Sequence, residues 1–186
     1  MTRTSISSRR TWCVLAFLLL LGLGVLAGAP RAQAQETTTV LVVRHAEKEW
    51  EDGDPPLSEI GWQRAEALLR VAEESGVSVL FGTQYRRTTQ TLEPIAEQLD
   101  LEILTHDARD SEGLARRILT DHAGRIVLVS GHSNTVPEIV AALGAPEPPP
   151  IEDWDYDDVF VVTIGPDETV TAVHLSYGVP SASPVP

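Results

Sequence analysis

Short, uninterrupted apolar runs recur along this chain, separated by longer segments with helical periodicity. The first run is Thr-Val-Leu-Val-Val at 39–43, a second at 77–81 contains one serine, and a shorter one lies at 126–129. Strands that read as continuous apolar runs are typical of parallel sheets covered on both faces. Because parallel strands need long crossover connections, the helical segments between them predict an α/β fold.

The helical segments carry start and stop signals. Ser58 is a good N-cap for a helix that runs to about Ser75, and Gly76 ends it. Pro94 lies inside the helix expected over 86–99, where it would kink the helix or mark its start. We predict a three-layer α/β/α sandwich around a mostly parallel sheet. The other expected elements are helices at 111–122 and 135–143, a strand at 101–104, and a hairpin of strands at 159–164 and 170–175.

The N-terminal segment has the pattern of a secretory signal peptide. Three arginines in the first ten residues precede an almost wholly apolar run at 14–27, and the segment ends in Ala-Gln-Ala at 32–34. This pattern predicts cleavage after Ala34 and export to the periplasm or the exterior. We therefore expect a signal peptide at 1–34 and a single domain at 35–186, with no membrane span after cleavage. The alternative is an uncleaved membrane anchor.

The balance of charge is acidic. Among 186 residues, 27 are acidic and 14 basic, a net charge of −13. Removal of residues 1–34 would take away four arginines, no acid and the single cysteine, leaving 152 residues with a net charge of −17. Nucleic-acid backbones need basic patches, so we expect no nucleic-acid partner. The cysteine count also excludes a disulfide scaffold and a cysteine-based zinc module.

Polar residues follow two of the predicted buried strands. Arg44-His45 comes directly after the first strand, and Gly131-His132 follows the strand at 126–129. In open α/β sheets, ligands bind at the carboxyl ends of the strands. Asn134 opens the next helix, whose free N–H groups and positive dipole end favour an anion. The sequence therefore predicts an anion-binding crevice that contains both histidines.

A third polar segment, residues 83–91, lies between these two strands. It places Arg86 and Arg87 at a loop-to-helix junction. The helix dipole disfavours cations at this position. Bidentate binding of an anionic ligand explains such an arginine better than solvent exposure does.

In order and spacing, these segments resemble the histidine phosphatase superfamily, the phosphoglycerate-mutase-like group. The resemblance covers about residues 39–175, nearly the whole of the expected domain. Arg44-His45-Ala46 matches the family's Arg-His-Gly motif, with Ala46 in place of Gly, and Gly131-His132 matches the second histidine motif. Residues 83–91 match Ser-x-x-x-Arg-x-x-Gln-Thr, with Thr83 in place of Ser and Arg87 at the Arg. Residues 54–58, with Gly61 and Ala65, match the segment that follows the first motif.

The resemblance implies an exported phosphatase that acts on phosphomonoesters, or on phosphohistidine, through a covalent intermediate. His45 would attack phosphorus as a neutral imidazole. Arg44, Arg87 and His132 would surround the phosphate oxygens. Since the guanidinium groups supply fixed positive charge, no metal and no cofactor are expected. The partner would be a small phosphorylated substrate. His132 is useful when protonated, so we expect the pKa values of the two histidines to be pushed apart.

The proton donor to the leaving group is the least determined part of this prediction. Larger relatives carry a Glu in an insertion that is short here. Glu47 lies two residues past the nucleophile and is the first candidate, and Asp110 is the second. A short member of the family can also lack a dedicated acid, which would favour good leaving groups. The further acidic residues of this stretch are Glu93, Glu97, Asp107 and Glu112.

Two other functions fit parts of the pattern. A non-catalytic module on the same fold would bind phosphate groups without forming a phosphoenzyme. A metal hydrolase would use His45, Glu47 and His132 as ligands. Residues 152–158 are predicted to be an ordinary acidic loop rather than a cation site, with Trp154 or Tyr156 beside the substrate. His106 and His122 are expected at the surface, and His174 in a structural role; the sequence leaves the oligomeric state open.

Overall fold

The computed structural model describes residues 36–50 and 53–183. The predicted signal peptide and its cleavage site lie outside these ranges. Within the described part of the chain, no helix is long and apolar enough to cross a membrane.

A six-stranded sheet forms the centre of the domain, in the order β3-β2-β4-β1-β5-β6. The four strands on the β3 side run parallel, whereas β5 and β6 pair antiparallel. This confirms the predicted mostly parallel sheet and its closing hairpin. The strands are β1 (Thr38–Arg44), β2 (Val79–Thr83), β3 (Ile103–His106), β4 (Ile126–Gly131), β5 (Asp158–Ile164) and β6 (Val170–Ser176).

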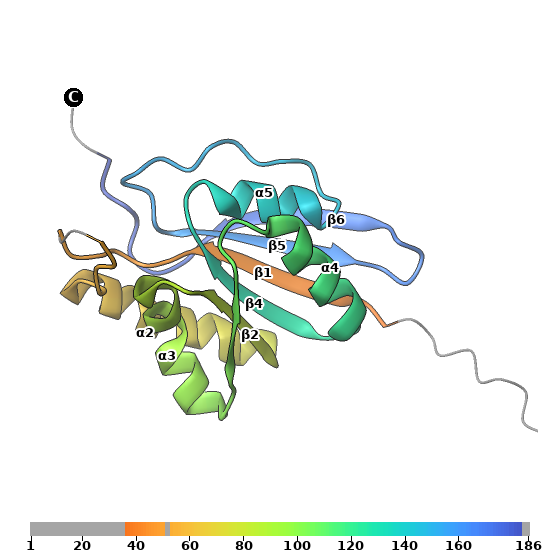
Figure 1. Cartoon of the computed structure of the whole chain (residues 1–186), viewed down its shortest axis with the longest axis horizontal. Helices are drawn as coiled ribbons and strands as arrows, with labels where there is room; N and C mark the ends of the chain where they lie inside the picture. Colours follow the sequence, from red (N-terminus) through yellow and green to blue (C-terminus); the bar gives the residue numbers. More distant parts are fainter. Residues whose placement is uncertain (1–35, 51–52, 184–186) are drawn as a thin grey trace, which may run out of the picture. The chain divides into compact units, whose positions relative to one another are not determined.

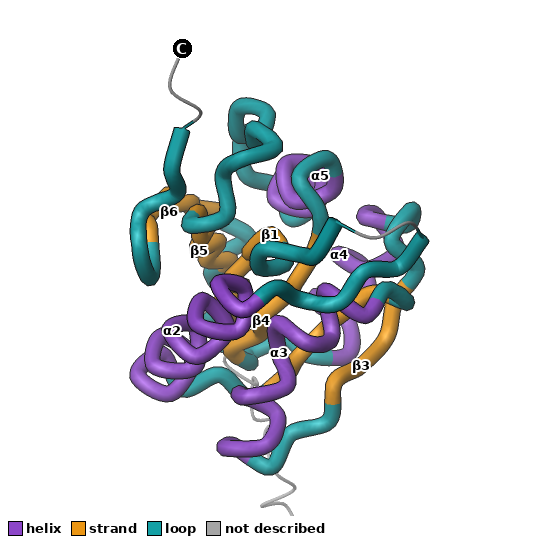
Figure 2. Tube along the Cα trace, turned by 90° about the vertical axis from the view of Figure 1, so that its left-hand side faces the viewer, coloured by secondary structure: helices purple, strands orange, loops and turns teal. Residues whose placement is uncertain are grey.

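Helices cover both faces of this sheet, as Figures 1 and 2 show. α2 (Glu59–Ser75) and α3 (Arg86–Leu99) lie on one face, and α4 (Ser111–Asp121) and α5 (Thr135–Ala142) lie on the other. Ser58 caps α2 through a hydrogen bond from the Gly61 N–H, as predicted. α3 continues through Pro94. The three-layer α/β/α sandwich is confirmed.

Alternate residues of β1 feed two separate cores. Val40 and Val42 pack with α4 and α5, whereas Leu41 and Val43 pack with α2 and α3. Since successive side chains of a strand point to opposite faces, a strand buried on both sides must be apolar throughout. This explains why the run at 39–43 is apolar throughout.

β2 and β3 begin two residues later than the sequence predicted. The reason for β2 is the end of the preceding helix. Gly76 adopts φ 72°, and the N–H of Val77 still bonds to the carbonyl of Ala72. The N–H of Ser78 then bonds to the carbonyl of Ile126 before the strand ladder starts. The apolar Val77 is therefore buried as part of the helix cap.

Adjacent parallel strands bring the two histidine motifs together. In the register of β1 and β4, Arg44 pairs with Gly131. The N–H of His45 donates to the carbonyl of Gly131 at 2.9 Å. The residue that follows each strand is therefore a histidine at the same edge of the sheet, as expected for a ligand site of this fold.

Gly61 is required by a close approach between α2 and the segment after β1. A Cβ at this position would overlap the backbone carbonyl oxygen of Glu47, to which the Ser58 N–H also bonds. We expect Gly61→Ala to lower the free energy of unfolding by about 1–3 kcal/mol through overpacking. Urea unfolding measures the change. Gln63→Ala, on the exposed face of the same helix, is the control, and an equal effect of both variants would contradict the explanation.

Candidate active site

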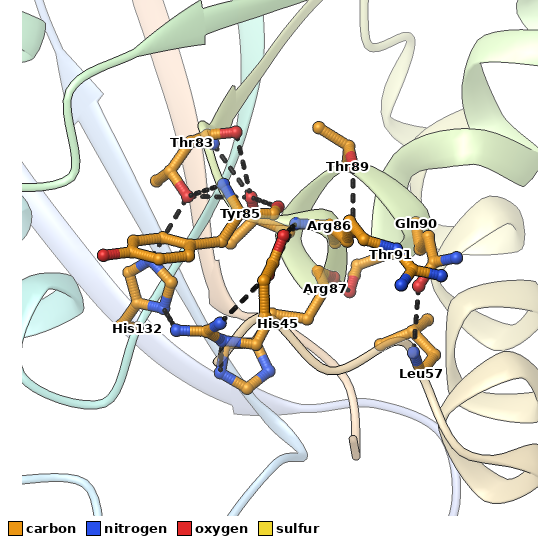
Figure 3. A network of polar contacts seen from close by, with 12 residues as sticks. His45, Leu57, Thr83, Tyr85, Arg86, Arg87, Thr89, Gln90, Thr91 and His132 are labelled. Carbon is orange, nitrogen blue, oxygen red and sulfur yellow. Dashed lines mark hydrogen bonds and ion pairs between the residues drawn. The ribbon is translucent and has the colours of Figure 1, made fainter. Parts of the chain in front are cut away.

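His45 and His132 face each other at the carboxyl edge of the sheet. Their ring centroids lie 5.3 Å apart, and both side chains are buried. Arg87, in the first turn of α3, reaches between them, as Figure 3 shows. Its Nε donates to His45 Nε2 at 3.2 Å, and its Nη2 donates to His132 Nδ1 at 3.4 Å. Three of the four side chains on which the predicted phosphate site rests are thus brought into one polar cluster.

The hydrogen bonds of His45 determine which ring nitrogen carries the proton. Nδ1 lies 2.8 Å from the carbonyl oxygen of Ala46, which can only accept. Nδ1 is therefore protonated, and in the neutral ring the lone pair is on Nε2. Nε2 is also the atom that faces Arg87. A phosphate bound to Arg87 would thus meet an unprotonated nucleophile.

His132 is oriented by a chain of threonine hydroxyls. Because Nδ1 accepts from Arg87, Nε2 carries the proton of the neutral ring and donates to Thr83 Oγ1 at 3.2 Å. Thr83 is held in turn by the hydroxyl of Thr88 at 2.9 Å. The sequence indicated these threonines as parts of a motif but not as supports of His132.

Asp54 positions Arg87 and was not predicted as a site residue. Its carboxylate accepts from the backbone N–H of Arg86 at 3.0 and 3.1 Å and lies 3.5 Å from Arg87 Nη1. On its other side, the Arg87 guanidinium lies 4.4 Å from the centre of the Tyr85 ring. Asp54 opens the segment 54–58 that the resemblance matched, and this is the sequence signal that could have found it.

Burial lowers the pKa of both histidines. The pKa of His45 falls to about 3 and that of His132 to about 4, in each case mainly by loss of solvation and further by the nearby positive charges. The expectation that the two values are pushed apart is therefore wrong for the free protein. Both rings are packed at the same buried edge, so both lose solvation. A bound phosphate dianion would favour a charged His132.

These low pKa values predict a loss of stability in acid. The pKa of His45 is about 3 in the folded protein, but an unfolded histidine titrates near 6.5. As the pH falls, the unfolded chain binds this proton first, so the free energy of unfolding falls below pH 6.5. Between pH 7 and 5, we expect wild type to lose about 2 kcal/mol more than His45→Gln. Urea unfolding at both pH values measures this, and parallel losses would contradict the burial effect.

Arg44 is turned toward the loop at 152–156. Its Nη1 donates to the carbonyl oxygens of Glu152 and Asp155, both at 2.8 Å, and its guanidinium lies 3.9 Å from the centre of the Tyr156 ring. Its Nε is buried and has no hydrogen-bond partner. A buried donor without a partner is costly, so this N–H is available for an oxygen of a bound anion. Arg44 thus combines the predicted phosphate role with an anchoring role that the sequence did not show.

Glu47 is held by an ion pair away from the histidine cluster. Both carboxylate oxygens accept from Arg64 of α2, at distances between 2.7 and 3.0 Å. The exposed fractions of the two side chains are 4% for Arg64 and 20% for Glu47. Arg64 also donates to the carbonyls of Tyr177 and Val179. The geometry gives Glu47 a packing role and no support as the proton donor.

Removal of this carboxylate charge should therefore affect stability. Glu47→Gln leaves the buried Arg64 guanidinium without its counter-ion, and we expect a loss of about 2–3 kcal/mol in the free energy of unfolding. Glu66→Gln, exposed on the same helix, is the control. Turnover of aryl phosphates with good and poor leaving groups should change by the same factor. A loss confined to poor leaving groups would instead restore Glu47 as the acid.

The remaining predicted site residues lie outside the cluster. Asp110 caps α4 by accepting from the Gly113 N–H at 2.8 Å, and Asn134 is exposed at the start of α5 without a side-chain capping bond. His174 pairs with Asp158 and stacks on Phe160. The prediction that His106 and His122 are exposed is wrong, because both side chains are half-buried and pack against Phe81.

The possible cation ligands do not gather around the two histidines. Because Glu47 bonds to Arg64, the set needed for the metal-hydrolase alternative is not assembled. Within the described residues, one group of three carboxylates lies close enough to share an ion: Asp155, Asp157 and Asp158, with ligand atoms within 4.8 Å of one another. All three are half-buried, and the prediction of an ordinary acidic loop stays a prediction.

The comparisons with known proteins agree with this geometry. Residues 40–110 match the family model described as the histidine phosphatase superfamily, branch 1. The matched segment begins inside β1 and contains the first histidine motif and Arg87. Residues 40–110 therefore resemble the histidine phosphatase superfamily, as the sequence predicted. This confirms the resemblance and its phosphoglycerate-mutase-like fold.

Individual members of the superfamily resemble the chain in part. An 8-oxo-(d)GTP phosphatase of Mycolicibacterium smegmatis is 35% identical over 102 residues, 48% of this chain and 32% of the relative. Phosphoserine phosphatase 1 of Hydrogenobacter thermophilus is 33% identical over 75 residues, 37% of this chain and 36% of the relative. The chain thus spans about a third of these relatives. The protein histidine phosphatase SixA, complexed with tungstate, has the same fold, with a TM-score of 0.59, 19% identity, and coverage of 74% of this chain and 96% of SixA.

Proposed function

We propose that this protein is a phosphatase that hydrolyses small phosphomonoesters through a phosphohistidine on His45. The observation that carries the proposal is the contact of Arg87 with both histidines, at 3.2 and 3.4 Å. One guanidinium thus links the unprotonated Nε2 of His45 to the second histidine. The match of residues 40–110 to the histidine phosphatase superfamily and the phosphatase names of the relatives support it.

The chemistry needs two displacements at phosphorus. In the first, the lone pair of His45 Nε2 forms the N–P bond while the bond from phosphorus to the leaving oxygen breaks. That oxygen takes a proton from solvent or a nearby acid. In the second, water attacks phosphorus, the N–P bond breaks, and inorganic phosphate leaves. The covalent intermediate thus divides one difficult hydrolysis into two easier steps.

Fixed positive charge would stabilise both transition states. Arg87 Nη groups, the free Nε of Arg44 and a protonated His132 can all contact the equatorial oxygens. The N-terminus of α5 adds the positive end of its dipole. This set supplies the charge that a metal ion supplies in other phosphatases, so we propose a metal-independent reaction.

The net charge of residues 35–186 favours one class of substrate. A net charge of −17 after residue 34 repels polyanions outside the site, which favours small monoesters over nucleic acids. The named relatives differ in what their names say they act on, 8-oxo-(d)GTP and phosphoserine. Phosphohistidine is a second substrate class for this site, because its N–P bond is itself readily cleaved.

The test is to trap the covalent intermediate. The purified 35–186 domain is mixed with a ³²P-labelled aryl phosphate in the presence of a chelator and quenched within milliseconds. We expect an acid-labile, alkali-stable label, and peptide mass spectrometry should place it on His45. Tight binding of phosphate with no label from several reactive esters would overturn the proposal in favour of a non-catalytic phosphate-binding module.

Export is a separate part of the proposal and rests on the pattern of residues 1–34. We expect the protein recovered from a periplasmic or culture fraction to begin at Gln35. N-terminal sequencing of that material tests it. Recovery of the uncleaved chain from membranes would favour the anchor instead.

A further inference from the structure

A cavity of about 720 Å³ lies beside the proposed phosphate site. Three segments surround it: the chain after β1, the start of α2, and the loop before β5. Its principal lining residues are Arg44, Lys48, Trp50, Ile60, Trp154 and Tyr156. Neither of the two buried histidines lines it, so it is a compartment next to the reacting atoms rather than the phosphate site itself.

Arg44 and Tyr156 connect this cavity to the nucleophile. Arg44 is part of the cavity wall, and its free Nε belongs to the proposed phosphate site. The Tyr156 ring lies under the Arg44 guanidinium, with its centroid 6.1 Å from that of His45. An ester whose phosphoryl group contacts His45 and Arg44 therefore has this cavity within reach of its remaining part.

The walls of the cavity carry unusually exposed apolar side chains. Trp50 is 98% exposed, Ile60 62% and Trp154 37%. Large hydrophobic side chains that gather at one exposed place mark binding sites more often than isolated ones do. Tryptophan and tyrosine favour flat aromatic partners, which they contact by stacked or edge-to-face packing.

The charges around the cavity disfavour a second anionic group. Lys48 is balanced by Glu49 and Asp153, which also line the wall, and Glu47 is already paired with Arg64. The Lys48 ammonium lies 5.5 Å from the centre of the Trp50 ring. No excess of positive charge is left here for a carboxylate or a further phosphate of the substrate.

We propose that this cavity binds the leaving group and takes an uncharged aromatic one, with fused rings favoured over a single ring. The inference rests on the proposed phosphatase function and specifies its substrate class. Small aliphatic alcohols such as serine or glyceric acid would leave most of the volume unfilled and would place a carboxylate against Glu49 and Asp153. Trp154 and Ile60 are then residues that determine specificity.

The test compares 2-naphthyl phosphate with phenyl phosphate, whose leaving phenols have similar acidity. We expect kcat/KM of wild type to be about tenfold higher for the naphthyl ester, the factor that additional aromatic contact supplies. Trp154→Ala and Ile60→Ala should bring the ratio close to one and leave inhibition by inorganic phosphate unchanged. Val173→Ala, equally apolar and exposed on β6, is the matched control and should keep the ratio.

The outcomes separate the inference from the function on which it rests. Trapped phosphoenzyme from both esters with equal kcat/KM values would overturn the inference and leave the phosphatase intact. The same holds if 3-phosphoglycerate is turned over as well as the naphthyl ester. If no ester labels His45, the phosphatase proposal fails. Binding of 2-naphthol, measured by the quenching of tryptophan fluorescence, then tests the aromatic site alone. Saturable quenching that is lost in Trp154→Ala supports this site, and no saturable quenching in wild type overturns it.

Discussion

His45→Gln is expected to reduce kcat/KM for an aryl phosphate by about 10⁴-fold or more, the order of loss seen when a covalent nucleophile is removed. Glutamine cannot form the N–P bond, but its side-chain oxygen can still accept from Arg87 Nε, as His45 Nε2 does at 3.2 Å. The pocket should therefore keep its shape. Steady-state kinetics with a sensitive fluorogenic ester measures the loss, and the ³²P label should disappear with it.

Binding of inorganic phosphate to His45→Gln separates loss of chemistry from loss of the site. Arg44, Arg87 and His132 remain, so calorimetry should find an affinity within about tenfold of wild type. His174→Gln is the matched control, because that histidine lies on β6 and pairs with Asp158. Equal activity losses in both variants would indicate a general effect of removing a histidine. Activity retained in His45→Gln would exclude the covalent mechanism.

The sequence could predict much of this site because its spacing is tied to the sheet. Where an apolar run buried on both faces ends, the strand ends too, and the polar residues that follow lie at the edge of the sheet. β1 and β4 are adjacent and parallel, so their polar residues lie at the same edge. Arg44-His45 and Gly131-His132 therefore had to meet. Arg87 could be placed with them because a cation at a helix N-terminus needs an anionic partner.

The parts that could not be predicted depend on contacts between distant segments. Glu47 is two residues from the nucleophile, but its partner Arg64 points inward from α2, which only the packing of that helix shows. Arg44 bonds to the loop at 152–155, more than a hundred residues away. The pKa values of the histidines depend on the extent of burial, which no motif specifies. All of these features depend on contacts between residues far apart in the sequence, whereas a motif describes only residues close together in it.

Arg87→Lys should cost about 10²–10³-fold in kcat/KM, the range found when one preorganised donor to a transition state is lost. A lysine keeps the charge but offers a single ammonium in place of a planar fork. It cannot donate to His45 and His132 at the same time, as Arg87 does, nor match its packing against Tyr85. If the fork geometry matters, kcat should fall more than KM rises, since the lost contacts strengthen in the transition state.

Arg86→Lys provides the comparison at the neighbouring position. The Arg86 side chain is exposed, and only its backbone N–H bonds to Asp54. We expect this variant to stay within about twofold of wild type, because surface charge away from the site contributes little. Should Arg87→Lys behave like Arg86→Lys, positive charge alone would suffice and the bridging geometry would not be the basis of catalysis. A large loss for Arg87→Lys with an unchanged urea midpoint would tie the loss to the site rather than to folding.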